Sequence, residues 1–118
     1  MRRKIAKPDG LEAISAYLSG SASEEIIATA VRFLLEELGT NHPGSSVEVR
    51  VPPFGVVQCI EGPSHTRGTP ANVVEMDPIS WIDLALGKNS FEDLASLGKL
   101  TASGSRSDLA GLFPIFEP

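Results

Sequence analysis

The spacing of apolar residues changes abruptly near the middle of this 118-residue chain. From Ser23 to Leu38 apolar side chains recur every three or four residues, as in a helix that buries one face. From Val47 to Val51 valines alternate with charged residues, which is typical of a strand with one face in the core. A chain with both patterns needs helices packed on a sheet, so all-helical and all-β folds are excluded.

Capping residues, prolines and glycines place the other elements. We expect helices over 8–18, 24–38, 78–86, 91–97 and 106–113, and strands over 47–51, 56–60, 73–76 and 99–103. The expected caps of the last four helices are Ser23, Asp77, Ser90 and Ser105. Because strands joined by short links stand beside grouped helices, the order predicts an α+β fold with a mostly antiparallel sheet and helices on one face.

Two further expectations concern the long helix and the long connection. Glu36 is expected to point away from the buried stripe of the long helix, and Gly39 is its expected left-handed stop. The connection 61–72 is rich in glycine, proline, serine and threonine. Part of it could pair as a further sheet edge.

Length and charge limit the classes of function. We expect a single domain over residues 1–118, with a helical pair at about 8–38 and strands and helices at 46–116. The net charge of -5 and the pI of about 4.9 argue against nucleic-acid binding, which needs a basic surface. No apolar run is long enough to cross a bilayer, and no signal peptide is recognisable, so the cytoplasm is the expected location.

No group of residues has the spacing of a catalytic or metal site. Cys59 is the only cysteine and has no basic neighbour in sequence, so we expect a buried, unreactive thiol and no internal disulfide. His42 and His65 lie in loops without ligand spacing. Ser105 does not stand in a nucleophile-elbow motif. We therefore expect no enzyme activity, no metal and no cofactor.

An ordered series of motifs in the second half resembles a known family. It comprises Arg50 to Gly55, Arg67 to Asp77, Gly87-Lys88, Gly98-Lys99-Leu100 and Ser103-Gly104-Ser105. This series resembles sterol carrier protein 2 domains, and most closely the bacterial, largely actinobacterial, sterol-carrier-like proteins. Residues 68–112 are also similar to the C-terminal domains of mycothiol-dependent maleylpyruvate isomerases. The chain ends in Phe116-Glu117-Pro118, and not in the Ser-Lys-Leu of peroxisomal relatives.

The resemblance implies a five-stranded sheet, with helices on one side and a hydrophobic cavity between the two layers. Lipids or acyl chains would bind there. The residues expected to line this cavity are Val49, Val51, Val57, Cys59, Met76, Trp81, Leu94, Leu112, Phe113 and Phe116. A filled core is the alternative for the same residues. The terminal aromatics could plug the cavity, meet a membrane surface or dock on the core.

Three arginines are anion-binding candidates for an acidic ligand group. Arg106 follows Gly104-Ser105, where free backbone N–H groups and the guanidinium together can bind an anion. Arg50, Gln58 and Arg67 could form a second polar group around the long connection, although Arg50 alternates with valines and so points away from them, most simply to solvent. The alternative for Arg106 is an exposed side chain beside a serine cap.

The resulting hypothesis is a non-catalytic carrier or binding domain for a hydrophobic small molecule. One alternative is an accessory domain related to the isomerase C-terminal domains, acting through a partner enzyme. Another is an interaction module that forms a homodimer through a sheet edge or through the long connection.

Overall fold

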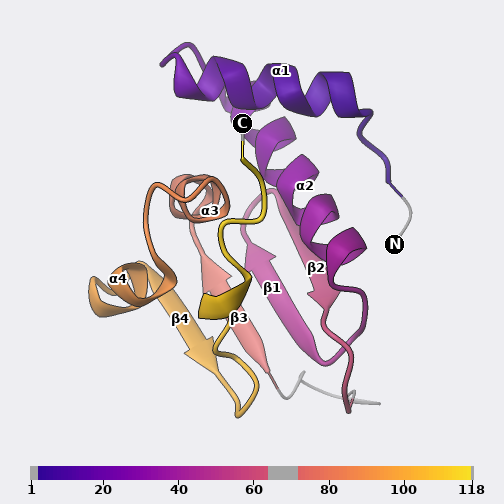
Figure 1. Ribbon diagram of the computed structural model, residues 1–118. Helices are drawn as coiled ribbons and strands as arrows, with labels where there is room; N and C mark the ends of the chain where they lie inside the picture. The colour runs from indigo at the N-terminus through magenta and orange to yellow at the C-terminus, as the bar shows by residue number, and fades with distance from the viewer. Residues whose placement is uncertain (1–2, 64–71, 118) are drawn as a thin grey trace.

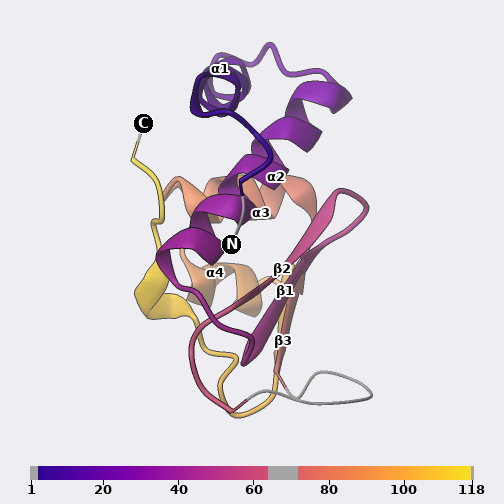
Figure 2. The same cartoon turned by 90° about the vertical axis from the view of Figure 1, so that its right-hand side faces the viewer.

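The computed structural model describes residues 3–63 and 72–117. In chain order the elements are α1 (Lys7–Leu18), α2 (Glu24–Asn41), β1 (Val47–Val51), β2 (Gly55–Cys59), β3 (Val73–Met76), α3 (Pro78–Ala85), α4 (Phe91–Ser96), β4 (Leu100–Ser103) and the 3-10 turn η1 (Ala110–Leu112). Helices α2, α3 and α4 lie on one face of the sheet (Figures 1 and 2). Helix α1 packs on α2, on the side away from the strands (Figure 1).

The sheet is mixed, with four strands among the described residues in the order β2-β1-β3-β4. The outer pairs β1–β2 and β3–β4 are antiparallel, but the central pair β1–β3 is parallel. The α+β class is confirmed, whereas the described sheet differs from the expected five-stranded, mostly antiparallel one. The suggested edge pairing within 64–71 lies outside the described residues.

The parallel pairing depends on Asn72, just before β3. Its carbonyl accepts the Glu48 N–H at 3.0 Å, and its Nδ2 donates to the Ser46 carbonyl at 2.8 Å. Asn72 is buried, so both bonds are shielded from water. The long connection between β2 and β3 allows the chain to cross to the other side of β1. Strand β3 then pairs there and runs in the same direction as β1.

Helix α2 is the main cover of the sheet. The Ser23 hydroxyl accepts the Ile26 N–H, and Glu24 and Glu25 occupy the first turn, where the helix dipole favours negative charge. The expected stop at Gly39 is wrong, because the helix continues to Asn41 and buries Gly39 within its last turn.

Helices α3 and α4 begin where their capping residues predict. Asp77 accepts the Ser80 N–H, and Pro78 starts α3 in the position that proline favours. Ser90 accepts the Asp93 N–H and starts α4. Trp81 on α3 is fully buried, and its indole N–H donates to the Val31 carbonyl on α2 at 3.2 Å. This bond ties the two main helices together.

The last predicted helix, 106–113, is wrong. Only η1 forms there, and Ser105 is exposed instead of capping a helix. The Ser107 hydroxyl donates to the Gly104 carbonyl, and the Asp108 carboxylate accepts the Ala110 N–H, so both side chains hold a turn. Beyond η1 the chain has no regular secondary structure as far as 117.

Candidate functional site

Seven of the predicted cavity residues come together between the sheet and the helices. Each is at most 5% exposed, and all belong to one continuous apolar cluster: Val49, Val51, Val57, Cys59, Met76, Trp81 and Leu94. The strand residues come from the face of the sheet that α2 and α3 cover. The structure thus brings together residues from β1, β2, β3, α3 and α4 that are far apart in the sequence.

The other three predicted residues belong to the C-terminal segment and are half-buried: Leu112, Phe113 and Phe116. The Phe113 ring meets the Trp81 ring edge-on, with centroids 5.9 Å apart at 87°. It also stacks on Phe91, with centroids 6.3 Å apart at 16°. Phe116 meets Phe33 of α2 edge-on at 6.0 Å. The terminal aromatics therefore pack on the rim of the apolar cluster.

The backbone of this C-terminal segment, residues 113–117, is attached to the end of α3. The N–H groups of Ile115 and Phe116 both donate to the Ala85 carbonyl, at 3.0 and 3.2 Å. Figure 1 shows the segment crossing in front of the sheet, between α2 on one side and α3 and α4 on the other. It lies on the helix-covered face of the sheet.

An open groove of about 350 Å³ runs along the C-terminal segment, beside the start of α4. Its apolar lining includes Leu84, Phe91 and Phe113, and Leu84 is a fully buried core residue. Lys88 and Asp93 are among the polar residues at its rim. Solvent in this groove therefore reaches the Phe113 ring, which packs against Trp81.

Close packing fixes the segment at one further point. Gly87 has φ +82°, and a Cβ there would stand 3.2 Å from the Pro114 Cβ. A side chain at this position would be strained and would push against the C-terminal segment. The glycine that ends α3 therefore also leaves room for the segment.

The two described arginine candidates lie at opposite ends of β1. The Arg106 N–H donates to the Asn72 side-chain oxygen at 2.9 Å, and its guanidinium lies close to Gly62, near the start of the long connection. Arg50 forms an ion pair with Glu48. Arg67 lies outside the described residues. The structure does not bring Arg50 and Arg106 together into one anion site.

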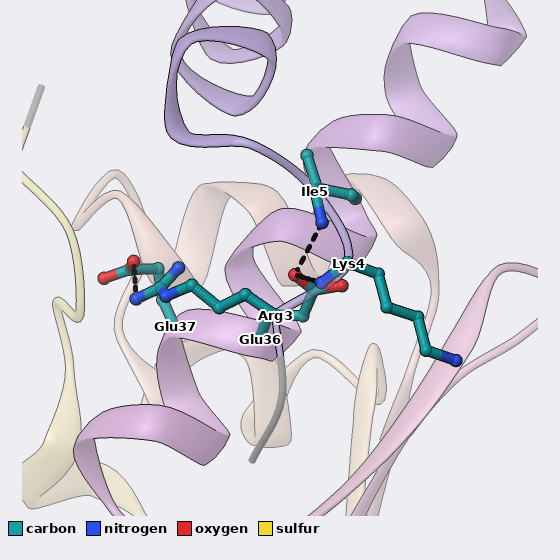
Figure 3. Close-up of polar contacts among 5 residues, drawn as sticks. All are labelled: Arg3, Lys4, Ile5, Glu36 and Glu37. Atoms are coloured by element: carbon teal, nitrogen blue, oxygen red, sulfur yellow. Dashed lines mark hydrogen bonds and ion pairs between the residues drawn. The ribbon is translucent and has the colours of Figure 1, made fainter.

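Sequence reasoning missed two polar contacts that hold α1 and the segment before it. Glu36 was expected to face outward, but it is 6% exposed and accepts the N–H groups of Lys4 and Ile5 at 3.0 and 3.1 Å (Figure 3). The Tyr17 hydroxyl donates to Asp83 at 2.6 Å, and burial together with this carboxylate raises the pKa of Tyr17. Both contacts join residues more than thirty positions apart, so no local pattern could have shown them.

The described residues contain no group of three or more histidine, cysteine, aspartate or glutamate side chains arranged to hold a metal ion. Burial raises the pKa of the Cys59 thiol to about 11, which keeps it protonated and unreactive at neutral pH. No described helix has the length and apolar character needed to span a membrane. Among the described residues, the predicted site residues form a buried apolar cluster with aromatic residues at its rim.

A one-sided α+β layer, with an apolar interior closed by aromatic residues, is the architecture expected of a sterol-carrier-like domain. A protein-family model described as "bacterial SCP ortholog" matches residues 23–115. The chain belongs to this bacterial family of sterol carrier protein-like domains, as its motifs indicated. Helix α1 lies outside the matched range. No curated protein matches the chain significantly.

Proposed function

We propose that this protein is a non-catalytic carrier that binds a lipid or acyl chain between its sheet and helices. The family it belongs to points to a lipid-binding carrier domain. The observation that carries the proposal is the position of Phe113. Its ring lies between the buried Trp81 and an open groove, so moving one side chain would connect the apolar interior to solvent.

In this proposal the C-terminal segment takes the place of the ligand when none is bound. Two backbone hydrogen bonds to Ala85 and three aromatic contacts hold it. Such bonds and ring pairs contribute roughly 1 kcal/mol each, or about 5 kcal/mol together. Burying an acyl chain contributes about 0.8 kcal/mol per methylene, so roughly six methylenes would offset the loss.

A polar head group would remain at the groove. Lys88 is the cation among the described residues that line the groove, and its Nζ lies 5.9 Å from the centre of the Tyr17 ring. Arg106 and Arg67 remain further candidates for an acidic head group. A fatty acid with its carboxylate beside Lys88 and its chain directed toward Trp81 is the ligand we favour.

The test uses Trp81, the only tryptophan in the chain, as the reporter. Delipidated protein is titrated with oleate, while a fluorescent acyl probe is followed in parallel. The proposal expects saturable probe uptake, displacement of the probe by oleate, and a change in tryptophan emission over the same concentration range. Absence of probe uptake, or uptake with no change at Trp81, would contradict binding in this region.

A matched pair of variants locates the site. Phe91→Ala removes a ring that lines the groove, and Leu97→Ala removes a side chain that is 68% exposed at the C-terminal cap of the same helix. Probe affinity is expected to change in the first variant and to remain unchanged in the second.

A further inference from the structure

Strand β2 forms one edge of the described sheet, since β1 is its only neighbour there. The Glu48 N–H points toward β3, where it donates to the Asn72 carbonyl. Because successive residues of a strand direct their backbone groups to opposite sides, the residues of β1 on either side of Glu48 direct theirs toward β2. The residues of β2 that are paired with these β1 residues form backbone hydrogen bonds with them. Val56 and Gln58, which lie between, therefore direct their N–H and C=O groups to the free edge.

This edge is accessible and is complementary to a second copy of itself. Both Val56 and Gln58 are exposed, and Val56 is 56% exposed although it is a large apolar residue in a strand. If two β2 strands pair antiparallel about Val57, Val56 of each copy faces Gln58 of the other. Each of these two positions then exchanges a pair of backbone hydrogen bonds, so all the free groups of Val56 and Gln58 are satisfied.

Two cations stand at the Gly55 end of this edge. Lys4 and Arg32 line a groove of about 230 Å³, together with Leu35 and Val56. The Arg32 Nε donates to the Phe54 carbonyl at 2.8 Å, and its guanidinium carbon lies 5.9 Å from the centre of the Phe54 ring. Figure 3 shows the Lys4 side chain directed away from Glu36. Neither Lys4 nor Arg32 forms an ion pair with a described residue.

The opposite end of the same strand carries an acid. Glu61 is exposed and lies two residues beyond the last residue of β2. Antiparallel pairing places the Gly55 end of one copy beside the Cys59 end of the other. Lys4 and Arg32 of each copy then approach Glu61 of the other copy. Because the dimer has two-fold symmetry, this attraction occurs two times in it.

From this complementarity of backbone and charge, we propose that β2 is a homodimer interface that joins the two four-stranded sheets into one. The occupant of the groove beside Arg32 is the Cys59–Glu61 end of the second copy. This inference is independent of the lipid-binding proposal, because β2 and β4 are at opposite edges of the described sheet. It is β4 that lies next to α4 and the groove that Phe113 lines.

The first test is a charge exchange between copies, followed by sedimentation equilibrium. Glu61→Lys and Arg32→Glu should each weaken the dimer about tenfold, since two attractions become two repulsions. In an equal mixture, Arg32 of the first variant faces Glu61 of the second, and the two introduced residues attract each other. The mixture should therefore recover dimerisation, which a merely destabilising substitution would not do.

The second test fixes the register. Val56→Cys and Gln58→Cys are made in separate chains and oxidised alone or mixed. Opposed residues in a hydrogen-bonded antiparallel pair have Cα atoms about 5.5 Å apart, a separation suited to a disulfide. Cross-linked dimer is expected chiefly from the mixture, while each variant alone and the native chain with its buried Cys59 should stay uncross-linked.

Three outcomes would overturn the proposal. They are a native chain that stays monomeric at all concentrations tested, a dimer that the mixed charge variants fail to restore, and a dimer whose mixed cysteine variants do not cross-link. Circular dichroism of each variant verifies that it is folded.

Discussion

Phe113 covers the buried edge of Trp81, with the two ring centroids 5.9 Å apart and the planes at 87°. This contact joins the C-terminal segment to the centre of the core, although 32 positions separate the residues. Its energy is modest, about 0.5–1.5 kcal/mol beyond the area buried, so it can be broken at small cost. In the carrier proposal, a contact of this strength closes the core without a ligand and yields to an acyl chain.

The Phe113→Ala variant should open the apolar interior without unfolding the protein. We expect faster uptake of a fluorescent acyl probe, because the ring no longer lies between Trp81 and the groove. Stopped-flow mixing measures the rate. Phe54→Ala is the control, since Phe54 is also a half-buried phenylalanine but lies in the β1–β2 turn. Equal rates for the two variants would contradict a gating role for Phe113.

The Trp81→Ala variant should lose much of the stability of the fold. The side chain is fully buried, and its N–H bond to Val31 connects α3 to α2. Truncation of a buried tryptophan typically costs about 3–5 kcal/mol, and the Val31 carbonyl also loses a partner. Urea unfolding followed by circular dichroism measures the change in the free energy of unfolding. Leu97→Ala should change it by less than about 0.5 kcal/mol, and equal losses would refute this account of the core.

The Glu36 carboxylate should hold the segment that precedes α1. Glu36→Ala removes the acceptor of the Lys4 and Ile5 N–H groups, so it should cost about 1–3 kcal/mol and speed hydrogen exchange at both amides. Glu36→Gln retains a side-chain oxygen and should have a smaller effect. The idea fails if both variants leave exchange at these two amides unchanged.

The free energy of unfolding should decrease at alkaline pH because of the buried Cys59 thiol. The pKa of Cys59 is about 11 in the folded protein against an ordinary 9.0, so the folded state holds this proton more tightly than the unfolded state. The contribution to stability is complete below pH 9 and is lost as the pH rises toward 11. Tyr17, whose pKa is also raised, adds to the loss above its ordinary value of 10. Cys59→Ala should flatten the profile of unfolding free energy between pH 9 and 10, and an unchanged slope would count against the burial argument.

Local signals predicted the parts of the fold that depend on neighbouring residues. Ser23, Asp77 and Ser90 cap their helices because each cap involves only a few consecutive residues. The alternation of valines predicted β1 to the residue. The apolar faces also predicted seven buried members of the candidate site, since any residue on those faces enters the core.

The errors occur where distant residues decide the structure. The parallel entry of β3 depends on Asn72 bonding to Ser46 and Glu48. The last predicted helix is replaced by the short η1 turn, and the chain just beyond it bonds to the Ala85 carbonyl through Ile115 and Phe116. A serine and an aspartate at capping-box spacing cannot show that the chain beyond them is anchored elsewhere, so the pattern around Ser105 was misleading.

Hydrogen exchange at the Ile115 and Phe116 amides, measured with and without oleate, tests the central claim most directly. Both amides donate to the Ala85 carbonyl and should be protected in the ligand-free protein. If an acyl chain takes the place of the C-terminal segment, saturating oleate should increase exchange at these two amides while the Trp81 backbone amide in α3 stays protected. Oleate that binds without changing exchange at Ile115 and Phe116, or that does not bind at all, would contradict the claim.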